Sequence, residues 1–301
     1  MMVLETNGLT KKYNDQLVVN NLNMHVRQGE IYALLGRNGA GKTTTLKMVM
    51  GLVKQTRGEI TVFGEKLTTS NTGGYRRIGA LIEAPAFYEN LTAIENLNLI
   101  ASLRGIHNKN AVNNTLELVG LEKDTNKKSG KFSLGMKQRL GIALALMHDP
   151  EFIILDEPTN SLDPAGIQQM RSLILRLSKE AGTSILISSH ILSEVEQLAD
   201  TIGIIHQGCL VEEVPMNEIR RRNRHFIKMV VSNTALAVPI LEKQLGITDF
   251  DVESDYILKI YEIERNMEDV NRYFHDAHIG VSEISMNKGN LEEYFMKITG
   301  G

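Results

Sequence analysis

The nine residues GRNGAGKTT, at positions 36 to 44, constrain the fold of this chain more than any other stretch. They fit the pattern G-x-x-x-x-G-K-[ST] of a phosphate-binding loop. The apolar run IYALL before them predicts a buried strand, and TTLKMVM after them has helical spacing. Because a glycine-rich turn between a strand and a helix forms a cradle for a nucleoside triphosphate, the sequence predicts an α/β nucleotide-binding fold.

The residue types in this loop suit phosphate binding. Gly39 and Gly41 lack Cβ atoms, which lets backbone N–H groups converge on phosphate oxygens at the positive end of the following helix dipole. Lys42 is expected to reach the β- and γ-phosphates, and Thr43 to bind Mg²⁺. The predicted nucleotide-binding residues of the loop are Gly36, Asn38, Gly39, Ala40, Gly41, Lys42, Thr43 and Thr44.

A second apolar run, within FIILDEPTNSLD (Phe152 to Asp163), ends in two adjacent carboxylates. A Mg²⁺ site next to a general base requires such a pair. Asp156 is expected to hold the metal through water, and Glu157 to take a proton from the attacking water. Alone, the pair could be a solvated end of a strand, but its place after a phosphate-binding loop favours an ATPase site.

Two further segments follow in the order of a known ATPase family. FSLGMKQRL (Phe132 to Leu140) is a Ser/Gly turn that opens a helix with basic residues, and ISSH (Ile187 to His190) ends another apolar strand. Each is weak by itself, since a histidine at the end of a strand is more often structural. Together and in this order, the motifs resemble those of the nucleotide-binding subunits of ABC transporters, over roughly residues 3 to 211.

This resemblance implies roles for five further residues. Tyr13 is expected to stack on adenine, Ser133 and Gly135 to form the signature loop, and Asp163 to belong to the D-loop. His190 is expected to contact the γ-phosphate. All five roles follow from the family pattern and not from composition or spacing.

The resemblance also implies a composite site. The expected catalytic residues are Lys42, Glu157 and His190, and the expected ligands are ATP and Mg²⁺. In this family, the signature loop of one subunit closes over the nucleotide that the phosphate-binding loop of another subunit holds. Since this chain has one loop of each kind, it should need a second copy or a paralogue, and we expect a homodimer. The other expected partner is a membrane permease.

Glu83 departs from the general family pattern. The segment Arg76 to Leu97 should carry a glutamine after its strand, and Glu83 stands at that position. A carboxylate can ligate Mg²⁺ but cannot donate a hydrogen bond when it is ionised, so Glu83 is expected in the metal site or in coupling to the permease, with a solvated loop charge as the alternative. Together with the signature SLGMK and a C-terminal extension, it resembles the ATPases of bacitracin and lantibiotic self-protection transporters.

The predicted architecture has two domains. Residues 1–218 are expected to form a P-loop cassette with a mixed sheet, an antiparallel edge sheet and a helical subdomain at about 84–148. Residues 219–301 show the order β-α-β-β-α-β of a ferredoxin-like domain, followed by a terminal helix. Pro239 is expected to interrupt the first helix of that domain. An irregular extension packed on the cassette is the alternative.

Composition limits the partners and the location. The net charge of −3 argues against a general electrostatic nucleic-acid binder, and the single cysteine, Cys209, fits a reducing compartment. No signal peptide and no run of eighteen apolar residues is present. The chain is therefore expected to be cytoplasmic and peripheral on the inner face of the cell membrane.

Three alternative functions can be weighed from the sequence. Another exported substrate is compatible with the same motifs. A DNA-repair or ribosome-acting ATPase would need a long coiled coil between the two loops or a second cassette in the same chain, and neither is present. A catalytically silent subunit is disfavoured because Lys42, Asp156, Glu157 and His190 are all present. The interpretation is an ATPase that drives a permease and exports, or gives immunity to, a peptide antibiotic.

Overall fold

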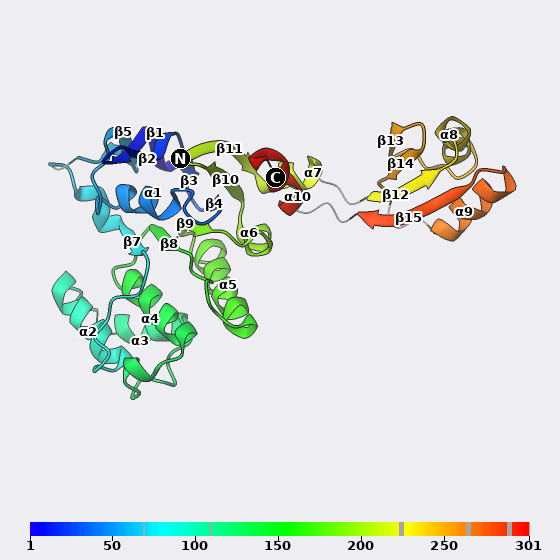
Figure 1. Ribbon diagram of the computed structural model, residues 1–301. Coiled ribbons are helices and arrows are strands. Elements are labelled where there is room, and N and C mark those ends of the chain that lie inside the picture. Colours follow the sequence, from blue (N-terminus) through cyan, green and yellow to red (C-terminus); the bar gives the residue numbers. More distant parts are fainter. Residues whose placement is uncertain (69, 109, 223–225, 263–265, 288–290, 301) are drawn as a thin grey trace. The chain divides into compact units, whose positions relative to one another are not determined.

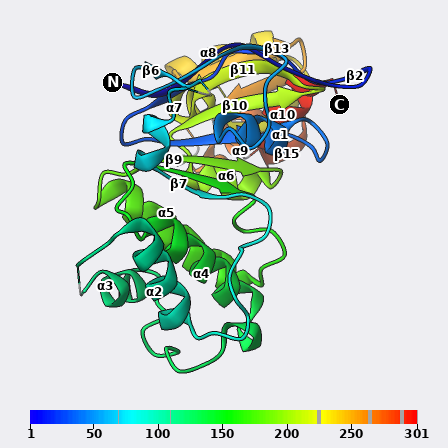
Figure 2. The same ribbon diagram turned by 90° about the vertical axis from the view of Figure 1, so that its left-hand side faces the viewer.

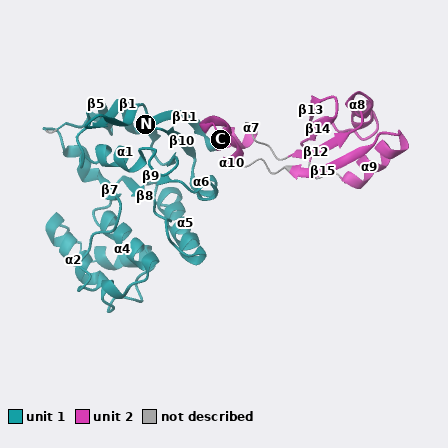
Figure 3. Cartoon of the chain, viewed as in Figure 1, with its two compact units in different colours: residues 1–216 teal, residues 217–301 magenta. Residues whose placement is uncertain are grey.

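The computed structural model describes residues 1–68, 70–108, 110–222, 226–262, 266–287 and 291–300. The chain forms two compact units, unit 1 (Met1–Met216) and unit 2 (Asn217–Gly301), which Figure 3 colours separately. The domain boundary predicted from the sequence, after residue 218, lies in helix α7 (Met216–Arg222). Each unit has its own sheets and helices.

An antiparallel sheet forms one layer of unit 1, as the alternating apolar residues before the phosphate-binding loop predict. Its order is β2-β1-β5-β6, and β3 pairs with β1 on a separate stretch. The strands are β1 (Met2–Tyr13), β2 (Gln16–Leu22), β3 (His25–Arg27), β5 (Arg57–Val62) and β6 (Glu65–Lys66).

A six-stranded sheet forms the second layer, in the order β11-β10-β4-β9-β8-β7. All neighbours are parallel except β10 and β11, which are antiparallel. β4 and β8 are buried along their whole length, which explains why they appear in the sequence as continuous apolar runs. The strands are β4 (Ile31–Leu35), β7 (Ile78–Leu81), β8 (Phe152–Asp156), β9 (Ser184–Ser189), β10 (Thr201–His206) and β11 (Cys209–Pro215).

Helix α1 (Lys42–Val49) packs between the two sheets. Leu46, Met48 and Val49 are buried in one core with residues of both sheets, among them Leu4 and Ile154. Figures 1 and 2 show α2, α3 and α4 together beyond the six-stranded sheet, away from the antiparallel sheet. The other helical segments of unit 1 are η1 (Gly73–Arg77), α2 (Ala93–Arg104), α3 (Ala111–Leu118), η2 (Ser129–Lys131), α4 (Leu134–Leu146), α5 (Pro164–Lys179) and α6 (Leu192–Leu198).

Unit 2 contains an antiparallel sheet in the order β13-β14-β12-β15. Helices α8 and α9 follow β12 and β14, so the order β-α-β-β-α-β is present, and Phe274 of α9 and Leu241 of α8 are buried against the sheet residue Met229. This confirms the predicted ferredoxin-like arrangement. The elements are β12 (Phe226–Val231), α8 (Thr234–Lys243), β13 (Phe250–Ser254), β14 (Ile257–Ile260), α9 (Met267–Asp276), β15 (Val281–Asn287) and α10 (Leu291–Thr299).

The expected interruption at Pro239 is wrong, because α8 continues through this residue. Proline removes the N–H that would bond to the carbonyl four residues earlier, at Ala235. Ala235 and Pro239 both lie on the exposed side of the helix, where water can satisfy that carbonyl. The helix therefore tolerates a proline that a buried position would not.

None of the helices in the described ranges combines the length and the apolar composition needed to cross a bilayer.

Candidate active site

The phosphate-binding loop connects the buried end of β4 to the first residue of α1. Two of its glycines are required by close approach of the chain itself. A Cβ atom at Gly36 would lie 2.4 Å from the carbonyl oxygen of Ile205, and one at Gly41 would lie 2.8 Å from that of Val18. Gly41 also has φ +107°, which side chains rarely allow. The rest of the fold therefore fixes the shape of this loop.

The tip of the phosphate-binding loop is exposed to solvent, whereas its inner end is buried. Asn38 and Gly39 are exposed, and nothing lies within 4 Å of the position that a Cβ at Gly39 would take. Ala40 is buried, and its carbonyl accepts a hydrogen bond from Gly208 N–H at 3.0 Å. Gly41 caps α1 with no side-chain hydrogen bond. This leaves the first turn of the helix suited to an anion.

Lys42 is the buried cation of the site, with a side chain only 5% exposed. Its Nζ donates to the carbonyl oxygens of Gly36 at 2.7 Å and Arg37 at 3.3 Å. The same Nζ lies 3.1 Å from Glu157 Oε1. The ammonium therefore lies at the base of the phosphate-binding loop, with Glu157 as its counterion.

Asp156, the last residue of β8, is buried beside the start of α1. Its Oδ1 accepts hydrogen bonds from Ser188 Oγ at 2.5 Å and Thr43 Oγ1 at 3.2 Å. Among the described residues, no group of three or more His, Cys, Asp or Glu side chains could hold a metal. One carboxylate and one hydroxyl fit Mg²⁺ only together with phosphate oxygens and water, which is how this ion commonly binds in nucleotide sites.

Glu157 is held in an unusual backbone conformation, with φ +48°. Its N–H donates to Ser188 Oγ at 2.9 Å and to the Ser188 carbonyl at 3.2 Å, which fixes the residue at the strand end. Glu157 Oε2 lies 2.8 Å from His190 Nδ1. Its two carboxylate oxygens thus contact a lysine and a histidine, and the side chain is 19% exposed.

Glu83 lies two residues after β7 and makes a different contact from the one expected. Its Oε1 is 2.5 Å from Lys47 Nζ, and among the described residues no hydrogen bond or ion pair joins it to Thr43 or Asp156. The hydrogen bond to Glu83 raises the pKa of Lys47; burial opposes this, and the charges of Glu83, Tyr13 and Asp156 add to it. Lys47 therefore lies in the electrostatic field of the predicted site.

The remaining predicted residues lie on the surface of unit 1. Tyr13 ends β1 and is 43% exposed, with Lys11 Nζ 4.6 Å from the centre of its ring. Ser133 caps α4 through a 3.3 Å hydrogen bond from Met136 N–H. Asp163 caps α5 by accepting a hydrogen bond from Gly166 N–H at 3.1 Å. All three side chains therefore lie at the surface, and two of them cap helices.

Gly135 and the signature turn lie near the segment that carries Asp163. A Cβ at Gly135 would be 3.8 Å from Leu162 Cδ2, an ordinary contact distance. Figures 1 and 2 show α4 among the helices beyond the six-stranded sheet, whereas α1 lies beside the sheets. Within one chain, the signature turn and the phosphate-binding loop thus belong to different parts of unit 1.

Two residues of this region were not predicted from the sequence. Ser188 joins Asp156 to the backbone of Glu157, and Lys47 pairs with Glu83. Ser188 lies within the ISSH motif, so a search for hydroxyl groups at the ends of neighbouring parallel strands could have found it. Lys47 gave no local signal, because its partner is 36 residues away.

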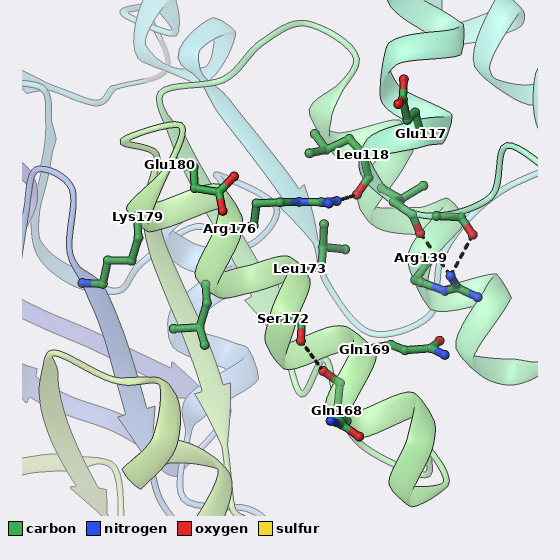
Figure 4. Close-up of a pocket in the computed structure, with 13 residues that line it drawn as sticks. Glu117, Leu118, Arg139, Gln168, Gln169, Ser172, Leu173, Arg176, Lys179 and Glu180 are labelled. Carbon is green, nitrogen blue, oxygen red and sulfur yellow. Dashed lines mark hydrogen bonds between the residues drawn. The ribbon is translucent and has the colours of Figure 1, made fainter.

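A cleft of about 730 Å³ lies apart from these residues, between the end of α3, α4 and α5 (Figure 4). Arg139 donates to the carbonyl oxygens of Val119 and Gly120 at 3.2 and 2.9 Å, and Arg176 donates to that of Leu118. The two guanidinium groups therefore satisfy the C-terminal carbonyls of α3. They stabilise the helical region and give no sign of a second active site.

Comparisons with known proteins agree with this geometry. Residues 19–160 match the family model described as ABC transporter. The chain is 50% identical to the bacitracin transport ATP-binding protein BcrA of Bacillus licheniformis, across 99% of this chain and 98% of that protein. It is 44% identical to the lantibiotic transport ATP-binding protein SrtF of Streptococcus pyogenes, across 70% of this chain and 90% of SrtF.

A solved structure of a dimer is also similar. It is a post-hydrolysis state of the ATP-binding cassette MJ0796 bound to ADP and Pi, with a TM-score of 0.63 and 25% sequence identity. The match covers 71% of this chain and 98% of that one.

Proposed function

Because this chain belongs to the ATP-binding, ATP-hydrolysing subunits of ABC transporters, we propose that it powers a separate membrane permease that exports, or gives immunity to, a peptide antibiotic of the bacitracin or lantibiotic type. Support for the substrate class comes from 50% identity over nearly the whole chain, unit 2 included, to a bacitracin transport protein. Transport of another molecule is the alternative.

The hydrolytic mechanism rests on one observation: a continuous set of contacts from Lys42 through Glu157 to His190. Glu157 is the general base that takes a proton from water. His190 orients the carboxylate through its 2.8 Å contact with Oε2 and lies at the same strand-end edge, where it can contact the γ-phosphate. The bonds from Glu157 N–H to Ser188 hold the base in place before the substrate arrives.

Binding of ATP would change the partner of Lys42. The ammonium is paired with Glu157 Oε1 at 3.1 Å, and phosphate oxygens carry more negative charge than one carboxylate. When Lys42 donates to the β- and γ-phosphates, Glu157 Oε1 loses its counterion and becomes a better proton acceptor. The lysine therefore couples substrate binding to activation of the base.

Thr43 and Asp156 are the residues that would hold Mg²⁺. The Thr43 hydroxyl and the Asp156 carboxylate are 3.2 Å apart at the start of α1, so both can face one cation, Asp156 through a water molecule. Mg²⁺ supplies charge neutralisation on the phosphates during phosphoryl transfer. Ser188 fixes the position of the Asp156 carboxylate by donating a hydrogen bond to its Oδ1.

The active assembly contains two copies of the cassette. The signature turn, Ser133 to Gly135, belongs to a different part of unit 1 from the phosphate-binding loop, so closure over ATP would need the turn of a second chain. The dimeric state of the related cassette MJ0796 supports this proposal. Tyr13 would stack on adenine, and Asp163 would lie near the dimer interface. The permease would hold this dimer at the inner face of the membrane.

The substrate proposal can be tested in a reconstituted system. The chain would be purified with the membrane protein that binds it, and ATP hydrolysis would be measured in vesicles with and without bacitracin or a lantibiotic. We expect the peptide to stimulate hydrolysis and cells that carry the pair to resist it, with Glu157→Gln as the inactive control. A complex that hydrolyses ATP but responds to neither peptide would refute the proposed substrate class and leave the ATPase assignment intact.

A further inference from the structure

Three carboxylates and two lysines lie along or beside α1, with Lys42 at its first residue and Lys47 in its last turn. Lys42 is paired with Glu157 at 3.1 Å, and Lys47 is paired with Glu83 at 2.5 Å. Among the described residues, Asp156 is the carboxylate of this set that accepts hydrogen bonds only from hydroxyl groups and forms no ion pair. Helix α1 thus provides one counterion for each of the two glutamates and leaves Asp156 available for a cation.

Lys47 lies on the same side of α1 as Thr43, because residues four apart occupy one helix face. Thr43 Oγ1 contacts Asp156 Oδ1 at 3.2 Å, so this face of the helix points toward the metal-binding carboxylate. The side chain of Lys47 is 28% exposed and that of Glu83 is 62% exposed. Both groups can therefore change partners without crossing the protein core.

We propose that Lys47 is a positioning residue that competes with Mg²⁺ for Glu83. This inference rests on the proposed function, since it assigns Glu83 to the edge where ATP binds. In the observed arrangement, the Glu83 carboxylate is bonded to Lys47 through Oε1. A metal that contacts Glu83, directly or through water, would be a second cation on a carboxylate whose Oε1 already holds Lys47, so the ammonium and the metal compete for its charge.

The exposure of the pair makes such an exchange feasible. Solvent screens exposed ion pairs, so they are weak and can open at little cost. A pair of this kind would weaken metal binding by about 1.5- to 5-fold, because that is the factor by which exposed ion pairs typically shift an equilibrium. Lys47 would therefore adjust metal affinity and would not determine whether the site forms.

The experiment uses the full-length chain saturated with ADP. Binding of Mn²⁺, a paramagnetic substitute for Mg²⁺, is measured from the loss of the free-ion resonance signal, and the Mg²⁺ dependence of ATP hydrolysis is measured in parallel. The variants are Lys47→Gln, Lys47→Arg, Glu83→Gln and the double variant Lys47→Gln/Glu83→Gln. Lys66→Gln is the matched control, since Lys66 forms an exposed ion pair with Glu59 in the antiparallel sheet.

We expect Lys47→Gln to bind Mn²⁺ about 1.5- to 5-fold more tightly, because Glu83 loses its competing partner. Lys47→Arg should match the parent chain, and so should Lys66→Gln. In the Glu83→Gln background, Lys47→Gln should have no further effect, whereas a general effect of charge or of helix stability would persist. The change should also shrink at high salt.

Two results would overturn the inference. One is unchanged Mn²⁺ affinity in Lys47→Gln, and the other is an equal shift with and without Glu83. If the parent chain hydrolyses ATP and Glu157→Gln does not, either result refutes only the role of Lys47. The proposed function itself would be refuted by a different result: a parent chain that shows no ATP hydrolysis dependent on Glu157.

Discussion

The phosphate-binding loop and the signature turn both contain glycine and both open a helix, yet their surroundings differ. Close approach of Ile205 and Val18 requires glycine at positions 36 and 41, whereas a Cβ at Gly135 would meet only Leu162 at an ordinary 3.8 Å. Lys42 is buried, and Leu134 of the signature turn is 45% exposed. The chain's own fold thus explains the first loop but gives no reason for glycine in the second.

If the site is composite, as we propose, this difference indicates which half a single chain completes. At the phosphate-binding loop, Lys42, Asp156, Glu157 and Ser188 already contact one another or a shared partner. At the signature turn, the Ser133 hydroxyl caps its own helix and has no other hydrogen bond to the part of the chain that the structure describes. If the exposed signature turn acts on ATP bound to a second chain, variants of the phosphate-binding loop and of the signature turn should lose ATP hydrolysis for different reasons.

The largest effect is expected for Glu157→Gln. This variant should keep its ATP affinity but lose about 10²- to 10⁴-fold in turnover, the usual contribution of a general base. It should also form a stable dimer with Mg·ATP, because the closed pair cannot hydrolyse its nucleotide. Hydrolysis rates and analytical sedimentation provide the measurements.

The matched control for this variant is Glu151→Gln, since Glu151 precedes the same strand at its other end and pairs with Arg77. It should hydrolyse ATP like the parent chain. A Glu157→Gln protein that stays monomeric at saturating ATP would count against a composite site.

Lys42→Ala should weaken the binding of ATP. Loss of the charged donor is expected to weaken ATP affinity about 10- to 150-fold, the range for one hydrogen bond to a charged group. Equilibrium titration with a fluorescent ATP analogue would measure it. ATP affinity equal to that of the parent chain would show that Lys42 serves only as the counterion of Glu157.

Mixing two inactive variants tests the composite site directly. Ser133→Arg should block closure over ATP without disturbing the phosphate-binding loop of its own chain. A heterodimer of Ser133→Arg and Lys42→Ala contains one site with two intact halves. The mixture should hydrolyse ATP at least about tenfold faster than either variant alone, since one catalytic contact contributes about 10²- to 10³-fold and only part of the mixture is heterodimeric. A mixture as inactive as its components would indicate that each chain works alone or that both sites must be intact.

A smaller effect is expected from removing residues 223–301. Both loops lie in unit 1, so the shortened chain should stay soluble and bind ATP within about twofold of the parent, as expected for a separately folded domain. Size-exclusion chromatography and nucleotide titration would measure this. An insoluble product would show that the C-terminal region completes the core of the cassette.

The smallest effect concerns His148, in the short connection from the signature helix α4 to β8. Its Nε2 donates to the Ile78 carbonyl at 3.0 Å, and burial, followed by the charge of Arg104, lowers its pKa from the ordinary 6.5. The unfolded chain therefore binds this proton more readily than the folded chain. Stability should be complete above about pH 6.5 and fall on acidification, by at most about 1.4 kcal/mol per pH unit for one proton.

His148→Gln should reduce this acid sensitivity, because the amide can still donate to Ile78 but does not titrate. Urea unfolding at pH 7.5 and 5.5 would compare the two proteins. An identical loss of stability in both would assign the acid effect to other groups.

The sequence predicted the positions of the phosphate-binding loop and the two carboxylates in the fold, for a physical reason. The phosphate-binding loop and the carboxylates Asp156 and Glu157 occupy the ends of parallel strands, and such ends meet at one edge of the sheet. The order of strands and helices could therefore be read from local apolar runs, including the ferredoxin-like order of unit 2.

Other features depend on distant residues and left no local signal. The Lys47–Glu83 pair joins residues 36 apart, and Ser188 matters only because β9 lies beside β8. The continuity of α8 through Pro239 depends on which side of that helix is solvated, and tertiary packing decides this. The proposed function of the signature turn involves a contact with a second chain, which the sequence of one chain does not describe.

The register of unit 2 has a further consequence. Phe226, where β12 begins, is the direct cross-strand partner of Asn287, where β15 ends. Every member of the buried cluster of this sheet lies between Ile227 and Ile279, so the segment from β12 to β15 closes its own core. Its two ends are about 5 Å apart, the spacing of paired strands. Domains whose chain ends lie close together tolerate insertion and exchange. We therefore expect that a linker of a few residues could replace this segment, and that evolution could exchange it as one unit.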